Sequence, residues 1–208
     1  FTASRSVSLE LFYNKAKMKK PIYLDYAAAT PLDSRVVKAM QPYFSEQFFN
    51  PSALYLASRE IRKALSEARS RVAGLLQVRE TEIIFTAGGT EANNLAIRGV
   101  MEQFPGKKLL ISSIEHESVR SVAGKYSHAE IKVNKYGQLN IEDLASNIND
   151  EVVLVSVIYA SNEVGTTQEL GKISDLIRET VKGRTERGVD TPLYFHSDAT
   201  QAAQFLNI

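Results

Sequence analysis

The chain of 208 residues is long enough to bury a domain-sized core, and its 44% hydrophobic and 24% charged content is that of an ordinary globular protein. Its 25 Lys and Arg against 24 Asp and Glu leave a net charge of +1, which gives no electrostatic reason to expect nucleic acid or an anionic membrane as partner. Cysteine is absent from these residues, so they hold no disulfide, thiolate metal site or nucleophilic thiol. The longest apolar run, Val152 to Ala160, falls far short of the roughly 20 residues that span a bilayer. We therefore expect one large cytoplasmic domain whose partner is a small molecule or another protein subunit.

The first 17 residues are rich in Ser and Lys and carry a single acidic residue, Glu10. Such a composition is typical of a transit segment and equally of an extension added upstream. Met18 is then a candidate natural start. We treat residues 1–17 as an extension of uncertain origin and place the folded part in residues 18–208.

From residue 33 onward, helical periodicity alternates with short runs of β-branched residues. Asp33 is expected to cap a helix that runs to about Phe44. Pro51 and Ser52 are expected to open a longer helix that ends near Gly74. The apolar positions of that helix recur at helical spacing: Ile61, Leu65, Ala68, Val72 and Leu75.

Five short segments have the composition of strands. They are Glu82 to Thr86, Leu109 to Ser113, Glu130 to Val133, Val152 to Tyr159 and Leu193 to Ser197. Between them, Asn140 is expected to cap a helix from Ile141 to Ile148, and Gly171 to Lys182 supplies another crossover helix. The alternation predicts an α/β fold with a doubly wound, mainly parallel sheet. In such a sheet, ligands bind beyond the carboxyl ends of the strands.

The segment from Ile83 to Asn94 passes from a predicted strand through a glycine turn into a predicted helix. Gly88 and Gly89 permit a close backbone approach, and the free N–H groups of a helix start favour an anion. With the hydroxyl of Thr90, the turn is a candidate phosphate cradle. It matches neither a Walker A loop nor GxGxxG, and taken alone such a turn is more often an ordinary strand-to-helix connection.

Polar residues follow three more predicted strands. His116 comes after the second strand and could stack on a flat cofactor or move a proton near neutral pH. Asn162 follows the fourth strand, and Asp198 and Gln201 follow the fifth. Each has a plain alternative, since a lone histidine is more often a packing residue and Asp198 could cap a helix. Polar groups at four strand ends make coincidence unattractive, and we expect them to surround one cavity. The residues concerned are Gly89, Thr90, His116, Asn162, Asp198 and Gln201.

No metal site is expected in this chain. Its three histidines show no ligand spacing such as HExxH. His128 and His196 are therefore expected to be surface or packing residues.

Six motifs occur along the chain in collinear order. They are Tyr23 to Pro31, Asn50-Pro51-Ser52, Phe85 to Ala96, Glu115-His116, Ser161 to Gly165 and His196 to Ala202. Together they resemble the cysteine desulfurases of the class V aminotransferase group, and the resemblance covers nearly everything from Ile22 to Gln204. It implies the pyridoxal-phosphate-dependent transferase fold. Residues 18–208 would supply its N-terminal segment and most of the cofactor-binding large domain.

The resemblance implies roles for the candidate residues in binding pyridoxal 5′-phosphate. Gly89 and Thr90 would bind its phosphate group. His116 would stack on the pyridine ring and help with proton transfer, which makes it the catalytic candidate. Asp198 would pair with the protonated pyridine nitrogen and so keep the ring an effective electron sink.

Two further residues complete the implied site. Gln201 would hydrogen-bond the phenolic oxygen of the cofactor. Asn162 would contact the cofactor or the carboxylate of the substrate. The family's Schiff-base lysine, persulfide-forming cysteine and substrate-binding arginine belong to later segments, and no residue up to Ile208 can be assigned to them. We therefore expect the 208 residues alone to be inactive.

The resemblance implies a homodimer that converts L-cysteine to L-alanine and enzyme-bound persulfide sulfur for Fe–S cluster or thio-cofactor synthesis, with a sulfur-acceptor or scaffold protein as partner. This chain has Tyr55, Ala57-Ser58 and Gln204 where family members commonly have a histidine, a Phe-Gly pair and a glycine, which leaves the subgroup open. Another class V enzyme is one alternative, such as a selenocysteine lyase, a kynureninase-like hydrolase or an aminotransferase. A non-catalytic remnant or assembly partner is the other. The residues that follow Ile208 would discriminate among the three.

Overall fold

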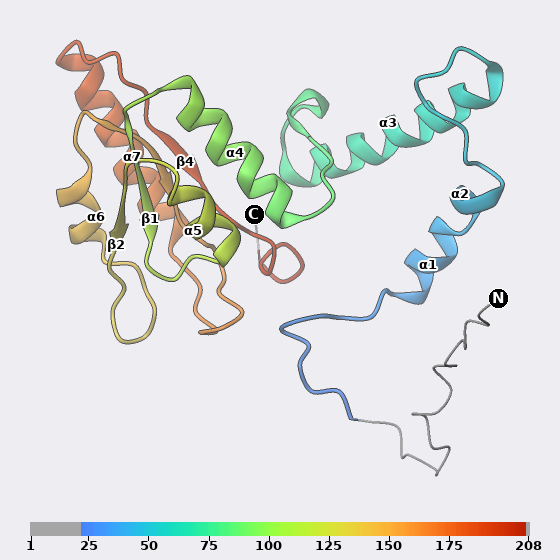
Figure 1. Ribbon diagram of the computed structural model, residues 1–208, viewed down its shortest axis with the longest axis horizontal. Helices are drawn as coiled ribbons and strands as arrows, with labels where there is room; N and C mark the ends of the chain where they lie inside the picture. Colours follow the sequence, from blue (N-terminus) through green and yellow to red (C-terminus); the bar gives the residue numbers. More distant parts are fainter. Residues whose placement is uncertain (1–21, 207–208) are drawn as a thin grey trace, which may run out of the picture. The chain divides into compact units, whose positions relative to one another are not determined.

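The computed structural model describes residues 22–206, which Figure 1 draws as a coloured ribbon. The predicted extension, residues 1–17, and the candidate start at Met18 lie outside the described residues. The chain falls into two units that divide between Leu32 and Asp33.

The described part of the first unit, residues 22–32, contains a turn built on Asp25. The Asp25 carbonyl accepts hydrogen bonds from Ala28 N at 3.1 Å and from the Tyr23 hydroxyl at 2.7 Å. The rings of Tyr23 and Tyr26 meet edge to face, with 5.2 Å between their centres. This turn belongs to the first of the six sequence motifs.

Three helices begin the second unit. They are α1 Ser34–Met40, α2 Pro42–Ser45 and α3 Leu56–Leu76. As predicted, the Asp33 carboxylate caps α1, accepting a hydrogen bond from Arg35 N at 2.8 Å. The single helix predicted to reach Phe44 is interrupted at Gln41, because Pro42 has no N–H for a helical hydrogen bond and opens a new helix.

The long helix α3 begins later than predicted. Ser52 N donates to Asn50 Oδ1 at 2.9 Å and Ala53 N donates to the Asn50 carbonyl at 3.1 Å, so that this segment forms a turn. The helix therefore starts at Leu56. It ends at Leu76 and is followed by Gln77, whose φ of 54° is left-handed.

The first predicted strand, Glu82 to Thr86, is wrong. Glu80–Glu82 form a 3-10 helix, η2, and residues 83–86 pair with no strand of the described sheet. Arg69 of α3 holds this segment instead. Its guanidinium donates to the Ile83 carbonyl and lies 4.8 Å from the centre of the Phe85 ring. A strand-like composition does not make a strand where no neighbouring strand is available.

The other four predicted strands form one parallel sheet. They are β1 Lys108–Ser112, β2 His128–Ile131, β3 Val152–Ser156 and β4 Tyr194–His196. Their order across the sheet is β2-β1-β3-β4, and each neighbouring pair is parallel. The predicted α/β fold with a parallel sheet is confirmed, with strand ends that differ from the predicted ones by a few residues.

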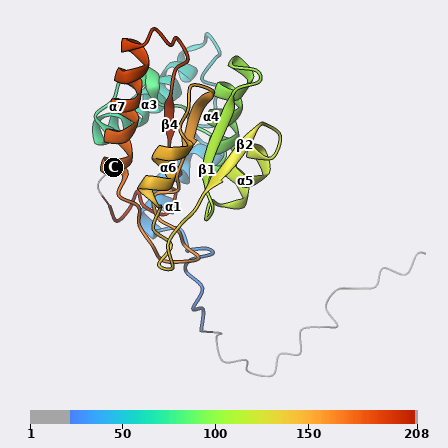
Figure 2. The ribbon, with the colours of Figure 1, turned by 90° about the vertical axis from the view of Figure 1, so that its left-hand side faces the viewer.

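Helices cover both faces of the sheet (Figures 1 and 2). Their bounds are α4 Gly89–Gln103, α5 Glu117–Ala123, α6 Ile141–Asn147 and α7 Leu170–Glu186. α4 and α5 pack with Leu109 and Ile111 of β1 on one face, and α6 and α7 pack with Leu110 on the other. The crossovers after β1 and after β3 thus leave on opposite faces, which puts the topological switch point between these two strands. No helix within residues 22–206 is long and apolar enough to cross a bilayer.

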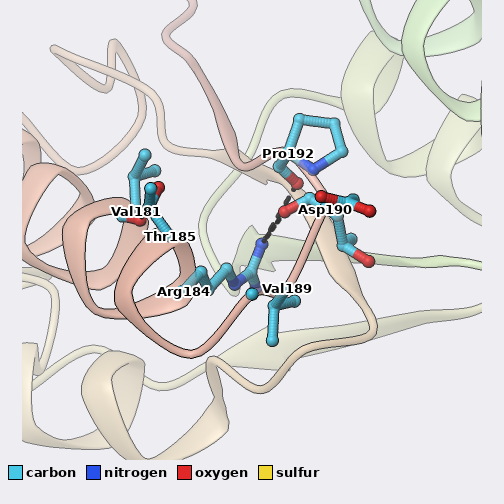
Figure 3. Close-up of a pocket in the computed structure, with 8 residues that line it drawn as sticks. Val181, Arg184, Thr185, Val189, Asp190 and Pro192 are labelled. Carbon is cyan, nitrogen blue, oxygen red and sulfur yellow. Dashed lines mark hydrogen bonds between the residues drawn. The ribbon is translucent and has the colours of Figure 1, made fainter.

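α7 ends beside a pocket of about 250 Å³ at the edge of the sheet where the strands begin (Figure 3). It is lined by Val181, Arg184, Thr185, Gly188, Val189, Asp190, Thr191 and Pro192. Beside this pocket, the Arg184 guanidinium donates hydrogen bonds to main-chain carbonyls, and Asp190 carries a negative charge.

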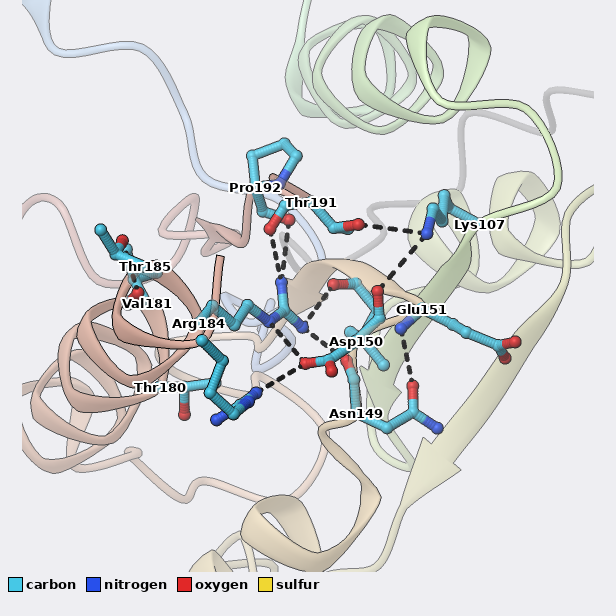
Figure 4. Close-up of polar contacts among 12 residues, drawn as sticks. Lys107, Asn149, Asp150, Glu151, Thr180, Val181, Arg184, Thr185, Thr191 and Pro192 are labelled. Carbon is cyan, nitrogen blue, oxygen red and sulfur yellow. Dashed lines mark hydrogen bonds and ion pairs between the residues drawn. The ribbon is translucent and has the colours of Figure 1, made fainter. Parts of the chain in front are cut away.

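The buried side chain of Arg184 ties α7 to the loops that precede β3 and β4 (Figure 4). This side chain is 2% exposed. Its guanidinium donates to the carbonyls of Thr191 and Pro192, each at 3.1 Å. It also donates to the carbonyl of Val152 at 2.9 Å and to that of Asn149. One side chain thus pairs four main-chain acceptors at this edge of the sheet.

We expect Arg184→Lys to lower the free energy of unfolding by about 2–4 kcal/mol, because an ammonium group cannot reach four acceptors and leaves buried carbonyls unpaired. Arg187→Lys is the matched control. The Arg187 side chain is 59% exposed and pairs with Asp150 at 2.9 Å, so its loss should cost less than about 1 kcal/mol. Urea unfolding followed by circular dichroism measures both variants. Equal losses would contradict the role given to Arg184.

Candidate functional site

The candidate site lies at the edge of the sheet where the strands end. The segment that follows β3 remains hydrogen-bonded to β4 and to the residues that follow β4. Val157 N donates to the His196 carbonyl at 3.0 Å, and Tyr159 N donates to the Asp198 carbonyl at 2.9 Å. Asp198 is thus fixed to the end of β3, one strand from the switch point.

On the side that faces β1, the segment after β3 bonds to the side chain of Glu115 instead of to a main-chain carbonyl. Ile158 N donates to Glu115 Oε1 at 2.6 Å, and the Ser112 hydroxyl donates to the same oxygen. Glu115 is 5% exposed, and its burial, partly offset by these hydrogen bonds, raises its pKa to about 7. Its second oxygen is buried without a hydrogen-bond partner in the described part of the chain, which adds to the cost of ionising the group.

α4 starts at the predicted glycine turn. Gly88 is the N-cap, and its backbone is extended, with φ of 167°. The N–H groups of the first turn have no partner within a helix, and they give the start of this 15-residue helix a partial positive charge. The Glu91 carboxylate accepts a hydrogen bond from Ala87 N at 2.6 Å, which fixes the turn. The turn borders an open depression of about 470 Å³ lined by Ala87, Gly88, Gly89, Thr90, Glu91 and Asn94.

The turn after β4 packs directly on the start of α4. A Cβ atom on Gly89 would lie 2.8 Å from the Thr200 hydroxyl oxygen, which is closer than nonbonded atoms approach. In the same turn, Thr200 N donates to Asp198 Oδ1 at 3.0 Å. The missing side chain of Gly89 therefore lets the Asp198 turn approach the glycine turn, a contact that the sequence did not predict.

His116 is the N-cap of α5. Its Nδ1 accepts a hydrogen bond from Ser118 N at 3.1 Å and lies 2.8 Å from Ser118 Oγ. A backbone N–H can only donate, so Nδ1 is an acceptor and the proton of the neutral ring is on Nε2. The residue as a whole is exposed at the start of α5.

Asp198 is 9% exposed and is an anion at neutral pH. Burial acts to raise its pKa and is the largest single effect. The hydrogen bonds from Thr200 N and from the Asn93 amide, helped by His196, outweigh burial together and hold the pKa of Asp198 below its usual range. A stabilised carboxylate at a strand end suits a cationic N–H group of a ligand.

Asn93 joins these groups. The residue is 3% exposed, and its Nδ2 lies 2.8 Å from Asp198 Oδ2 and 2.9 Å from Ser118 Oγ. A hydrogen-bonded chain therefore runs from Asp198 through Asn93 and Ser118 to His116. The sequence interpretation missed Asn93, Ser118 and Glu115 as functional candidates. For Asn93 the sequence did hold a signal. It is a polar residue four positions before Ile97, so it lies on the buried face of an amphipathic helix.

The other two histidines behave as packing and surface residues, as expected. The His196 side chain is half-buried, with Nδ1 2.9 Å from Ser156 Oγ, and burial lowers its pKa against the opposing effect of Asp198. His128 is exposed at the start of β2, and its Nδ1 lies 3.1 Å from the Tyr126 carbonyl oxygen.

The other two predicted site residues, Asn162 and Gln201, lie in exposed turns. Asn162 is exposed in the turn 161–165, which a hydrogen bond of 2.8 Å from Gly165 N to the Ser161 carbonyl closes. Gln201 is exposed in the turn after β4. The depression at the glycine turn is lined by Gly89 and Thr90 but by none of the other four predicted residues. A single cavity around all six therefore stays a prediction.

Comparison with known proteins places this arrangement in a family. The chain belongs to the aminotransferase class-V family, whose model matches residues 22–185. Among curated relatives, cysteine desulfurase IscS of Methanosarcina thermophila is 35% identical over 196 residues and that of Rickettsia felis is 41% identical over 189 residues. These alignments cover 91% and 87% of this chain but 46% and 43% of the two relatives. The chain spans about half the length of the curated relatives it matches.

Solved structures agree with the fold. A NifS-like protein superimposes with a TM-score of 0.82 at 26% identity, over 90% of this chain and 51% of that protein. A structure described as SspA in complex with cysteine gives a TM-score of 0.79 at 30% identity, over 89% of this chain and 52% of that one. The predicted transferase fold and the resemblance to cysteine desulfurases are confirmed.

We expect Gly89→Ala to lower the free energy of unfolding by about 1–3 kcal/mol, because the new methyl group meets the Thr200 hydroxyl. Gly88→Ala is the matched control and should change stability by less than about 0.5 kcal/mol. Its backbone is extended and a Cβ there meets nothing within 4 Å. Thr200→Ala in the Gly89→Ala background should recover part of the loss, as a double-mutant cycle by urea unfolding will show. Independent, additive losses would contradict the contact.

Glu115 should make stability depend on pH. Its folded-state pKa of about 7 lies above the ordinary value of 4.5, so the folded state holds the proton more tightly. Its contribution is fully present below pH 4.5 and is lost as the pH rises to about 7. We therefore expect the unfolding free energy of the wild type, relative to Glu115→Gln, to fall across this window by at most about 3 kcal/mol. Thermal unfolding at several pH values measures this difference, with Glu117→Gln as the exposed neighbouring control. Parallel curves for wild type and Glu115→Gln would show that the carboxyl is ionised throughout.

Proposed function

We propose that this chain forms the cofactor-binding part of a pyridoxal 5′-phosphate-dependent cysteine desulfurase. One observation carries the proposal: the buried anion Asp198 shares a hydrogen-bonded chain with His116, beside the glycine turn of α4. Membership of the class V family and the cysteine desulfurase relatives support it. Residues 18–208 would supply the N-terminal segment and most of the large domain, with residues 1–17 as an extension.

The residues present fit this cofactor chemically. A phosphate suits the N–H groups at the start of α4, where Gly89 begins the helix and Thr90 adds a hydroxyl. Asp198, with its pKa held below the usual range, suits a protonated pyridine nitrogen. The His116 ring, fixed through Nδ1, offers a flat surface for stacking.

Bound at this site, pyridoxal phosphate supplies an electron-withdrawing ring that eases bond breaking at the substrate α-carbon. Asp198 would keep the pyridine nitrogen protonated and the ring electron-poor. His116 would hold or move a proton at Nε2. We propose that Gln201 bonds the phenolic oxygen and that Asn162 contacts the cofactor or the substrate carboxylate.

We propose L-cysteine as the substrate of the whole protein, with L-alanine and persulfide sulfur as products. The structural neighbour described as SspA in complex with cysteine supports this choice. We further propose a cytoplasmic homodimer that passes sulfur to an acceptor or scaffold protein for Fe–S cluster or thio-cofactor synthesis. Sedimentation of the whole protein tests the dimer, and a monomer at micromolar concentration would count against it.

The cofactor site can be tested with 4′-deoxypyridoxine 5′-phosphate, which keeps the phosphate and the pyridine nitrogen but has no aldehyde to react with lysines. We expect this ligand to bind the chain and Asp198→Ala to weaken its binding about tenfold or more, because one charge-assisted hydrogen bond is lost. Asp190→Ala, at the other edge of the sheet, is the matched control and should bind as the wild type does. Calorimetric titration measures all three. Equal affinity in Asp198→Ala would sink the assignment.

These 208 residues alone should form no alanine from L-cysteine above the free-cofactor background. They contain no thiol to accept sulfur, and no lysine at a position that the family uses for the cofactor. An assay of alanine and sulfide, with and without a segment that supplies the lysine and cysteine, measures this. Turnover by the 208 residues alone would overturn the assigned chemistry.

A further inference from the structure

Asn93 is a buried polar residue on the inner face of α4, outside the six residues predicted for the site. It lies four positions before Ile97, which packs in the core between α4 and the sheet. An apolar side chain would be the ordinary choice at such a position, because a buried amide without partners is costly. Here the amide has two partners: Asp198 of the proposed cofactor site and Ser118, whose hydroxyl contacts His116.

Both hydrogens of the amide nitrogen are used. Nδ2 lies 2.8 Å from Asp198 Oδ2 and 2.9 Å from Ser118 Oγ, although Asp198 is 105 residues away along the chain. If the Asn93 amide were turned over, its oxygen would lie 2.8 Å from Asp198 Oδ2, and two acceptors would repel each other. The nitrogen of the amide therefore faces Asp198.

The direction of the remaining hydrogen bonds follows from this amide. Because Ser118 Oγ accepts a hydrogen from Asn93, its own hydrogen is available for His116 Nδ1 at 2.8 Å. Ser118 N donates to the same Nδ1 at 3.1 Å. Two donors on Nδ1 leave the ring proton on Nε2, away from the helix start.

We propose that Asn93 is a positioning residue of this site, whose amide holds Asp198 and, through Ser118, His116 in one fixed hydrogen-bonded arrangement. The role of the held groups in cofactor binding rests on the proposed function; the arrangement itself does not. Aspartate could not replace Asn93 in this role, because two carboxylates at this distance would share a proton. Leucine, which has the same branched arrangement of heavy atoms but no polar group, would leave Asp198 with fewer donors.

The test uses the ligand-free chain labelled with ¹³C and ¹⁵N. The carboxyl carbon of Asp198 reports its titration, and the ring nitrogens of the three histidines report their tautomers. In Asn93→Leu we expect the Asp198 titration to move upward toward the ordinary range. The other charged groups coupled to Asp198 are Glu115 and His196, whose signals are followed in the same experiment.

A second variant separates the two arms of the amide. Ser118→Ala should leave the titration of Asp198 in place. It removes one of the two donors to His116 Nδ1 and should raise the fraction of His116 with its proton on Nδ1, while Ser118 N, which remains, keeps the Nε2–H tautomer the major one. Asn147→Leu is the matched control. Its amide bonds Asp143 within α6, so both Asp198 and His116 should behave as in the wild type.

If Asn93 only filled space, its replacement would leave the titration of Asp198 unchanged. If Asn93→Leu is folded and Asp198 titrates as in the wild type, the proposal is overturned. If Asn93→Leu does not fold, Asn93→Ser takes its place. Because it keeps one donor, it must still move the titration of Asp198 upward from that of the wild type, and an unchanged titration would overturn the proposal.

The proposed function has a test that is independent of the role of Asn93. 4′-Deoxypyridoxine 5′-phosphate should bind Asn93→Leu about tenfold more weakly than the wild type, the equivalent of one lost hydrogen bond. Absence of binding to the wild type would contradict the cofactor site, while the Asp198 titration would still decide the role of Asn93.

Discussion

The hydrogen bonding of the segment that follows β3 is the constraint on which the site depends. Val157 and Tyr159 donate toward β4, and Ile158 donates the other way, to the Glu115 carboxylate. These bonds lock the ends of three strands in register across the switch point, where the helices leave on opposite faces. Asp198 and His116 are then held in place without a ligand, which is the preorganisation that the proposed cofactor site requires.

The arrangement also explains why so many polar groups tolerate burial here. Asp198 is stabilised by donors from Thr200 and Asn93, and Glu115 bonds Ser112 and Ile158. The two carboxyls have opposite outcomes: the pKa of Asp198 is lowered, whereas burial raises that of Glu115. The balance between burial and the other effects decides between them. Burial prevails at Glu115, where the charge of Asp198 raises the pKa further, whereas the hydrogen bonds of Asp198, helped by His196, outweigh its burial. Asp198 thus remains an anion for a ligand, while Glu115 joins β1 to β3.

The parts of the fold that depend on local patterns could be predicted from the sequence. Asp33 and Asn140 cap their helices as expected, and four strands follow from β-branched runs between turn residues. The strand predicted at 82–86 failed because strand pairing is not a local property, and the start of α3 failed because the Asn50 side chain forms a turn.

In the site, too, residues recognisable from the local sequence could be predicted, whereas contacts between distant segments could not. The positions of His116 and Asp198 beyond β1 and β4 could be predicted, because polar residues after strands are visible in the sequence, and the start of α4 follows from the glycine turn, although no strand precedes it in the described part of the chain. The roles of Asn93 and Glu115 could not, since their partners come from other strands, 105 residues away in the case of Asn93 and Asp198. Nor could the contact between Gly89 and Thr200, which depends on how the last turn packs on α4.

The most direct measurement is a crystal structure of the chain with 4′-deoxypyridoxine 5′-phosphate. We predict that the phosphate lies on the N–H groups at the start of α4, that the pyridine nitrogen is hydrogen-bonded to the Asp198 carboxylate, and that the His116 ring stacks on the pyridine ring. A phosphate bound elsewhere, or a pyridine nitrogen that faces away from Asp198, would contradict this prediction.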